Sequence, residues 1–260
     1  MSGKLRPYLL VFPAVLLLLL LFVGGLAVGF GQSLGFLPAQ GQSQLTLAYY
    51  AHVLGDPGFY ASLGLTLYLA FVSTTLSIIF AVGIAMVLRH RFRGSRTATF
   101  FFQLPLPVPH LVAAAGIVML VTQSGIFARL LYAIGALERP ADFPVLVFDR
   151  GYVAAILVFM WKEIPFIGLV VLAVLKGIGF EYEEAAQTLG ANAWQRFRYV
   201  LLPLILPSIV STSFIVFAFL FGSFEVPLLL GQRYPNTLPV TAYRAYIDPD
   251  LARRPEAMAI

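Results

Sequence analysis

Residues 8–30 read YLLVFPAVLLLLLLFVGGLAVGF, a run of 23 residues without a charged side chain. As a helix rising about 1.5 Å per residue, the run is about 34 Å long and can cross a hydrocarbon core about 30 Å thick. Lys4 and Arg6 precede it, as in a signal peptide. The run exceeds the ~7–15 apolar residues of a signal peptide and lacks a clear cleavage site. We therefore interpret it as a retained membrane span.

The composition extends this interpretation to the whole chain of 260 residues. Hydrophobic residues make up 60% and charged residues only 11%, whereas soluble domains carry about 25% charged residues. There is no cysteine, which excludes a disulfide scaffold, a cysteine nucleophile and thiolate metal sites. The net charge of +5 permits nucleic-acid binding or a set of basic cytoplasmic loops, and the positions of the basic residues must decide.

Long stretches with few or no charges recur along the chain and predict five spans. These lie at about 8–30, 61–88, 99–122, 151–175 and 199–224. At the end of the sequence, Glu256 leads into apolar residues, which predicts that a further helix begins near residue 257. We interpret this as a truncated sixth span. The expected fold is an all-α polytopic membrane protein with a single transmembrane domain over residues 1–260.

Cytoplasmic loops are enriched in Lys and Arg. With the N-terminus inside, the cytoplasmic segments hold Lys4, Arg6, Arg89, Arg91, Arg93, Arg96, Lys176, Arg196 and Arg198. The outer segments, which are longer, hold Arg129, Arg139, Arg150, Arg233, Arg244, Arg253 and Arg254. The N-terminus is therefore predicted to be cytoplasmic, and the positive charge needs no nucleic acid.

The loop at about 176–198, between the fourth and fifth spans, contains a short amphipathic helix over 181–190 with Glu181 and Glu184 in its first turn. Gly190 provides the left-handed residue that commonly ends a helix, and Asn192 can cap a second helix. Small side chains at Ala185 and Ala186 allow another protein to approach the backbone. Periodicity alone favours a capped helix that lies at the membrane surface.

The residues of this loop and of the span that follows carry a resemblance to a known family. They are Glu184, Ala185, Ala186, Gly190, Ala191, Phe197, Leu202, Pro203 and Pro207. The pattern resembles the cytoplasmic signature of the permease subunits of binding-protein-dependent ABC importers, although Leu189 stands where the family often has Asp. More loosely, residues 161–166 and 223–257 resemble the branch that serves polyamines, with iron, sulfate and thiamine permeases nearby.

The resemblance implies a MetI-like importer permease fold, usually with six spans, in the bacterial inner membrane. It implies that a cytoplasmic ABC ATPase dimer couples to this chain through Glu181, Glu184, Ala185, Ala186, Gly190 and Ala191. It also implies a second permease subunit, identical or homologous, and a periplasmic or lipid-anchored substrate-binding protein. A polyamine is the expected substrate. Neither a cofactor nor nucleic acid is expected, and membrane lipid is the surrounding partner.

Several polar residues fall within or near the predicted spans and are candidates for a translocation pathway. They are Trp161, Lys162, Glu163, His110 and Glu225. Charges inside a membrane are expensive, so Lys162 and Glu163 either line a pathway or form an internal structural pair. His110 can contact substrate or serve as a buried hydrogen-bonding group. Glu225 can meet a cationic substrate or the binding protein, or it can reach interfacial water.

Catalytic signatures are missing from the sequence. There is no phosphate-binding loop, no zinc-protease motif and no serine-nucleophile motif, and three scattered histidines do not favour a metal site. We therefore expect a non-catalytic subunit. The alternatives are an intramembrane enzyme using Lys162 and Glu163 as acid and base, and a stand-alone channel or secondary carrier. Only the importer subunit is expected to co-purify with a stoichiometric ATPase.

Overall fold

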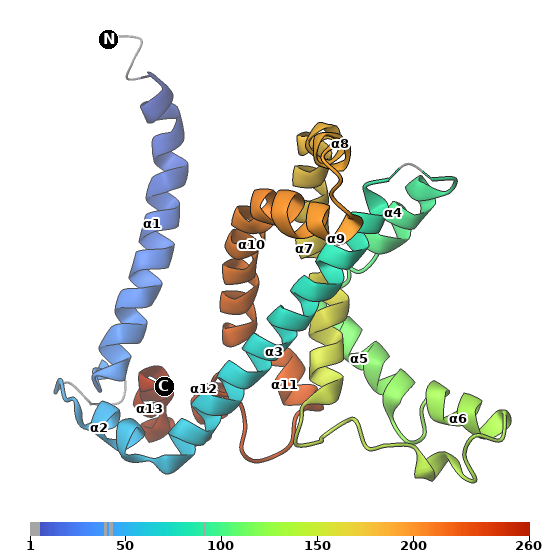
Figure 1. Cartoon of the computed structure of the whole chain (residues 1–260). Helices are drawn as coiled ribbons and strands as arrows, with labels where there is room; N and C mark the ends of the chain where they lie inside the picture. The colour runs from blue at the N-terminus through green and yellow to red at the C-terminus, as the bar shows by residue number, and fades with distance from the viewer. Residues whose placement is uncertain (1–5, 39–40, 42–43, 91) are drawn as a thin grey trace. The chain divides into compact units, whose positions relative to one another are not determined.

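The structure, a computed structural model, describes residues 6–38, 41, 44–90 and 92–260. Within these ranges the secondary structure is helical and contains no β-strand (Figure 1). Five helical segments in the described chain are long and apolar enough to cross a membrane, as predicted. They are Tyr8–Ser33, Pro57–Leu88, His110–Ala133, Val153–Ile178 and Ala193–Gly222. Lys4 and Arg91, two residues of the predicted cytoplasmic set, lie outside the described residues.

The chain divides into two compact units, residues 1–62 with 240–260, and residues 63–239. The first unit contains α1 (Arg6–Ser33), α2 (Ala48–Gly55), η4 (Leu251–Arg253) and α13 (Arg254–Ala259). In this unit α13 packs against α1 and α2. The most apolar window of α1 is 0% buried, which suits a helix surrounded by lipid. A helix thus begins at Arg254, close to the predicted start, and the sixth span stays a prediction.

The second unit holds the remaining spans. After α3 (Pro57–Leu88) come α4 (Ser95–Gln103), α5 (His110–Val121), α6 (Ile126–Ala133), η2 (Pro140–Asp142), α7 (Val153–Ile178), α8 (Glu181–Thr188), α9 (Ala193–Arg196), the π-helical turn η3 (Phe197–Leu201), α10 (Leu202–Gly222), α11 (Glu225–Leu230) and α12 (Leu238–Tyr246). The boundaries between the two units fall within α3 and α12. Within the second unit, α4 and α8 lie at one end and α6 and α11 at the other (Figure 1).

The central helix of the second unit is α7, which packs against α10, α5, α11 and α4. Its apolar window is 61% buried, against 28% for the segment that ends with α10. Gly168 allows α4 to approach α7, because a Cβ atom there would lie 2.6 Å from Cζ of Phe102. The close contact explains why α4 is held against the core although it is too short to span a membrane.

The third span differs from the predicted range of 99–122. Residues 104–109 are not helical, and they separate α4 from α5, which begins at His110. Pro105, Pro107 and Pro109 have no backbone N–H to donate, so a regular helix cannot run through them. The span then continues past the predicted end through a tight turn at Gly125 into α6. A Cβ atom at Gly125 would lie 2.7 Å from the Leu120 carbonyl oxygen.

The fourth span begins at a cap that the sequence-based interpretation did not include. The Asp149 carboxylate accepts hydrogen bonds from the backbone N–H groups of Gly151 at 2.8 Å and Val153 at 3.0 Å. Tyr152 adopts a positive φ of 55° at this turn and is only 1% exposed. The bond to Val153 satisfies one of the N–H groups that the first turn of a helix leaves without partners, and the bond to Gly151 fixes the turn before it.

Candidate functional site: the α8 hairpin and the charged turn of α7

The predicted loop helix is present as α8, and its end has the predicted geometry. Gly190 has a φ of +86°, in the left-handed region. The Gly190 N–H donates to the Gln187 carbonyl at 2.9 Å, and the Ala191 N–H donates to the Ala186 carbonyl at 3.0 Å. This pair of bonds is the Schellman arrangement, which requires a left-handed residue after the helix. The predicted left-handed conformation of Gly190 at the end of this helix is confirmed.

The surface of α8 is open to contact. None of its residues is buried, and its first turn carries three carboxylates, those of Glu181, Glu183 and Glu184. Tyr182 is 58% exposed and the adjoining Leu189 is 89% exposed. Glu181, Glu184, Ala185 and Gly190 are exposed, and Ala186 and Ala191 are half-buried. Acidic side chains beside exposed apolar ones are typical of a surface that another protein covers.

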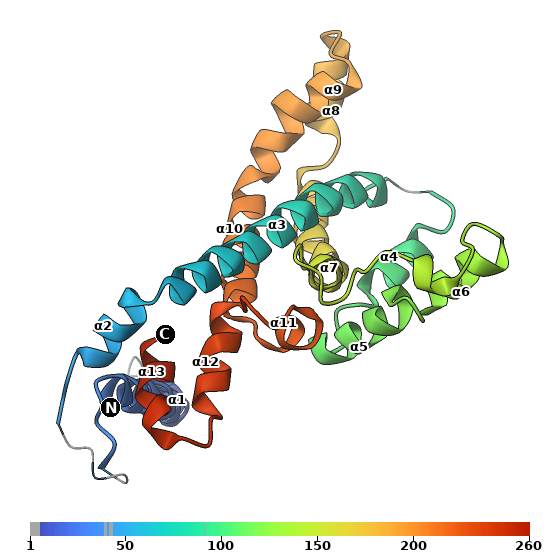
Figure 2. The ribbon, with the colours of Figure 1, turned by 90° about the horizontal axis from the view of Figure 1, so that it is seen from below.

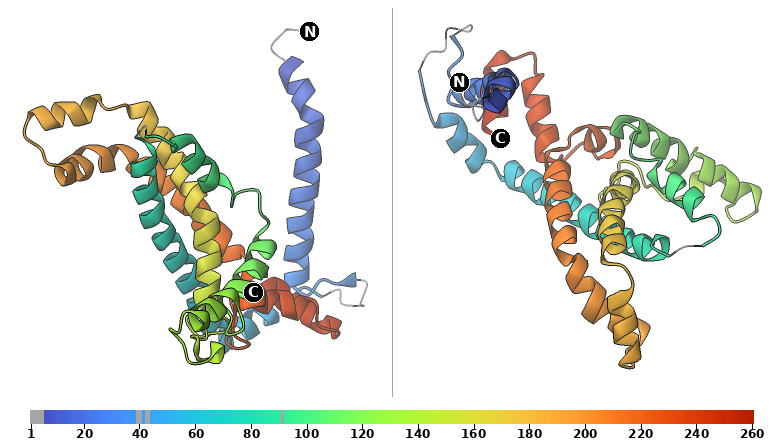
Figure 3. Two further views of the ribbon diagram at one scale, coloured as in Figure 1. Left: turned by 90° about the vertical axis from the view of Figure 1, so that its right-hand side faces the viewer. Right: turned by 90° about the horizontal axis from the view of Figure 1, so that it is seen from above.

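A short hairpin fixes α8 against the next helix. Asn192 caps α9 as predicted, because its side chain accepts from the Gln195 N–H at 2.9 Å while the Gln195 side chain accepts from the Asn192 N–H at 2.8 Å. Arg196 donates to the Gln187 side chain at 2.5 Å. The hairpin of α8 and α9 projects from one end of the second unit (Figures 2 and 3).

Arg89 anchors the start of α8, and the sequence-based interpretation did not identify this role. Its side chain is only 1% exposed. Nη1 donates to Glu183 at 2.6 Å, Nη2 donates to the Gly179 carbonyl at 2.8 Å, and the guanidinium carbon lies 4.5 Å from the Phe180 ring centroid. The sequence signal was an arginine that directly follows the charge-free run of α3, but only the folded chain brings it to Glu183.

Lys162 and Glu163 are both buried, at 5% and 7% exposure, and they have different partners. Lys162 Nζ donates to the carbonyl oxygens of three residues of the non-helical run between α4 and α5: Pro105 at 2.6 Å, Leu106 at 3.0 Å and Val108 at 2.6 Å. The prolines prevent regular helical hydrogen bonding in this run, although the Pro105 carbonyl also accepts from the Val108 N–H at 3.2 Å. A lysine ammonium with three donors fits such a group of carbonyls.

Glu163 meets the other polar residue predicted within the spans. Its Oε1 lies 3.2 Å from Nε2 of His110, and the His110 ring lies 5.0 Å from the ring of Phe219. The fold therefore joins α5, α7 and α10 at one polar contact. Trp161 is 41% exposed, and Glu225 is an exposed residue in the first turn of α11. Trp161 and Glu225 are therefore not part of the buried site that contains Lys162 and Glu163.

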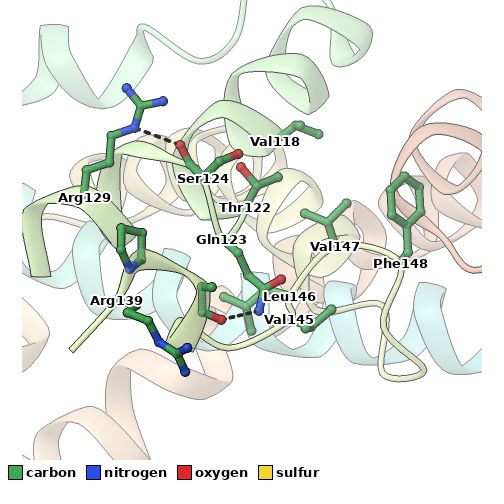
Figure 4. A pocket seen from close by; sticks show the side chains of 12 residues that line it. Val118, Thr122, Gln123, Ser124, Arg129, Arg139, Val145, Leu146, Val147 and Phe148 are labelled. Atoms are coloured by element: carbon green, nitrogen blue, oxygen red, sulfur yellow. Dashed lines mark hydrogen bonds between the residues drawn. The ribbon is translucent and has the colours of Figure 1, made fainter. Parts of the chain in front are cut away.

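The opposite end of the second unit carries a hollow of about 750 Å³ between α5, η2 and the segment before α7 (Figure 4). Gln123 closes one wall by donating to the carbonyls of Ala141 at 2.7 Å and Phe143 at 3.1 Å. Arg129 donates to the Ser124 carbonyl at 3.0 Å. No group of three or more His, Asp or Glu side chains suited to a metal ion occurs among the described residues.

Comparison with known proteins gives consistent results. The profile of the family described as "binding-protein-dependent transport system inner membrane component" matches residues 73–252. The sulfate transport system permease protein CysT of Salmonella typhimurium is 29% identical over 84% of this chain and 76% of its own length. The trehalose/maltose transport system permease protein MalF of Thermococcus litoralis is 26% identical over 78% and 69%.

Solved structures show the same fold. A bacterial ABC transporter that imports the acidic polysaccharide alginate contains a chain that superposes with a TM-score of 0.80 at 20% identity, covering 98% of this chain and 87% of that one. The family resemblance, the permease fold and the expectation of a non-catalytic subunit are confirmed. The chain belongs to the family of inner-membrane components of binding-protein-dependent transport systems.

Proposed function

We propose that α8 and the turn at Gly190 form the element through which a separate ATPase subunit drives this permease, and that this end of the spans faces the cytoplasm. The observation that carries the proposal is the exposed acidic helix α8, held in a hairpin that projects from one end of the second unit (Figure 2). A partner that is to move the spans needs such a protruding element. The basic residues predicted at this end support the orientation.

The contacts of α8 suit a rigid lever. Arg89 ties its first turn to α3, and Arg196 ties its last turn to α9, which continues into α10. Displacement of α8 would therefore be passed to two spans at once. A partner shifts such an equilibrium only if it binds the two states with different affinity. We expect the ATPase to bind α8 with higher affinity when the ATPase is closed around ATP.

Cross-linking tests the proposal directly, because the chain has no cysteine of its own. Ala185→Cys places a thiol on the exposed face of α8, and Gln123→Cys places one at the opposite end of the same unit as a matched control. In inner-membrane vesicles, the first variant should cross-link to the ATPase and the second should not. Cross-linking of both, or of the control alone, would contradict the assignment of α8.

The same two variants test the orientation. An impermeant maleimide added to intact spheroplasts should label Gln123→Cys and should spare Ala185→Cys until the membrane is opened. The reverse pattern would place α8 outside and would end the proposal, because ATP is hydrolysed on the cytoplasmic side.

The substrate is a separate proposal. The relatives named above are sulfate and trehalose/maltose permeases, so the expectation of a polyamine substrate has no support from them. Glu163, a pathway candidate whose carboxylate could attract a cation, is engaged with His110. We propose an oxyanion of the sulfate class as the first substrate to test. Uptake of radiolabelled sulfate by a deletion strain should depend on this chain, with putrescine and maltose as comparisons; uptake of putrescine alone would restore the polyamine prediction.

A further inference from the structure

A basic hollow lies at the α8 end of the second unit, separate from the exposed face of α8. Its volume is about 1020 Å³, and it is bounded by the end of α3, by α4 and by the end of α7. The buried side chains of Leu88 and Leu175, 6% and 1% exposed, form part of its lining.

The charges that line the hollow have one sign. Arg89, Arg96 and Lys176 all contribute to the lining, and the lining holds no carboxylate among the described residues. The charge of Arg89 is already balanced by Glu183. Arg96 and Lys176 are exposed, and neither side chain has a hydrogen-bond or ion-pair partner in the part of the chain that the structure describes. Two cations that face one hollow without a counter-charge favour an anionic ligand.

Neutral donors accompany the two cations. Ser95 and Gln103, on α4, also line the hollow, and their side chains carry a hydroxyl and an amide. A phosphate diester offers acceptor oxygens only, and side-chain donors grouped around two cations match that requirement.

The neighbouring surface is apolar, which identifies the ligand as an amphiphile. Phe100 lines the hollow and is 60% exposed, and the adjacent Phe101 on α4 is 62% exposed. The lining helices α3 and α7 are membrane spans that end here. Acyl chains can therefore lie along exposed aromatic rings while a headgroup enters the hollow. Basic pockets at the cytoplasmic ends of membrane helices commonly bind anionic lipid headgroups.

We propose that this hollow binds the phosphate of an anionic phospholipid, with Arg96 and Lys176 as its charged ligands. The cytoplasmic placement of the site rests on the proposed function; the binding itself does not. Because Arg89 and Phe180 also line the hollow, a bound headgroup would rest against the joint that anchors α8. Lipid at this position would stabilise the joint and so affect how α8 moves the spans.

The test measures lipid retained by the transporter complex purified in mild detergent. The complex is exchanged against vesicles of phosphatidylcholine with or without phosphatidylglycerol, and bound lipid is measured by native mass spectrometry. The wild-type chain should retain phosphatidylglycerol preferentially. Each cation near a membrane surface contributes about a fivefold preference for anionic lipid, so Arg96→Gln should lower the enrichment about fivefold and Arg96→Gln with Lys176→Gln about 25-fold. Arg96→Lys should keep most of it.

Arg198→Gln is the matched control, because it removes an exposed cation from the α8 end that does not line the hollow. It should leave the enrichment unchanged. Equal enrichment in the control and the double variant, or no enrichment in the wild type, would overturn the proposal. Displacement of the lipid by inorganic phosphate would show a free-anion site and would also overturn it. Loss of ATPase from the double variant with unchanged lipid would show a protein contact instead.

The tests of lipid binding and of ATPase coupling are independent of each other. Cross-linking of Ala185→Cys to the ATPase does not depend on the residues of the hollow, and lipid retention does not depend on ATP. A cross-link without lipid enrichment would remove only the lipid site. Enrichment without a cross-link would remove only the ATPase assignment.

Discussion

Arg89 illustrates how much one side chain contributes to the site. Its guanidinium donates hydrogen bonds to the Glu183 carboxylate and the Gly179 carbonyl, and it lies over the Phe180 ring. All three partners lie in the first turn of α8 or just before it. An arginine suits this position because its planar fork presents several donors in a fixed geometry while its face stacks on a ring. Gly190 contributes differently, through a backbone conformation that other residues adopt only with strain.

We predict that Arg89→Gln uncouples transport from ATP hydrolysis. The variant leaves Glu183 without its cation and frees α8 from α3, so the ATPase can still bind but moves the spans less. Coupling between sites is commonly worth about 5–150-fold, and we expect substrate imported per ATP hydrolysed to fall at least about fivefold in proteoliposomes. A double-mutant cycle with Glu183→Gln provides the control. Additive losses would show that the pair is not the anchor.

Substitutions at Gly190 should show whether coupling depends on the positive φ of the backbone or on the absence of a side chain. No atom lies within 4 Å of a Cβ atom built there, so any penalty comes from the positive φ and not from a clash within this chain. Gly190→Asn should retain coupled uptake, because Asn tolerates this conformation. Gly190→Val should lose it. Gly190→Arg should also lose it while inserting into the membrane normally. Equal uptake by the Asn and Val variants would show that the turn is not needed.

Among the elements, α7 is the one on which the others depend. It packs against α10, α5, α11 and α4, and Lys162 joins it to the three carbonyls of the proline-rich run. The run cannot bond to itself as a helix does, and in a membrane each unpaired carbonyl is costly. The buried lysine therefore acts as a structural brace between two elements.

We expect Lys162→Met to destabilise the second unit. It removes three charge-assisted hydrogen bonds, each worth about 1.5–3 kcal/mol before relaxation, and a loss of at least about 2 kcal/mol is expected. Thermal unfolding in a detergent without anionic lipid measures the effect. Lys176→Met on the same helix is the control, because that ammonium is exposed and donates no hydrogen bond within the described part of the chain. A similar melting temperature for wild type and Lys162→Met would exclude the brace.

For the molecule as a whole, family membership and the apolar helices place the chain in the inner membrane as a multi-pass subunit. The window of α1 is 0% buried and those of the other spans are 28–61% buried, so most spans present apolar surface beyond the chain itself. Lipid covers such surfaces, and so does a second permease subunit in a transporter of this family.

Transport by the whole assembly should require ATP. Membranes containing the chain, its ATPase and the binding protein should accumulate substrate only when ATP is present, and the ATPase should co-purify with the chain in a fixed ratio. Omitting the ATPase gene is the control, and it should abolish uptake without lowering the amount of permease in the membrane. Uptake that persists without the ATPase would instead support a channel or secondary carrier.

The sequence alone determined the class of fold, the five spans and the loop that contains α8. These follow from local quantities, namely runs of apolar residues and the residue types that begin and end helices, such as Asn192 and Gly190. The tertiary structure decided the partners of the charged groups. Arg89 and Glu183 are 94 residues apart, and His110 and Glu163 are 53 apart, so no local pattern could pair them. It also decided which donor the break at 104–109 receives, because Lys162 donates to three carbonyls of that run from another helix.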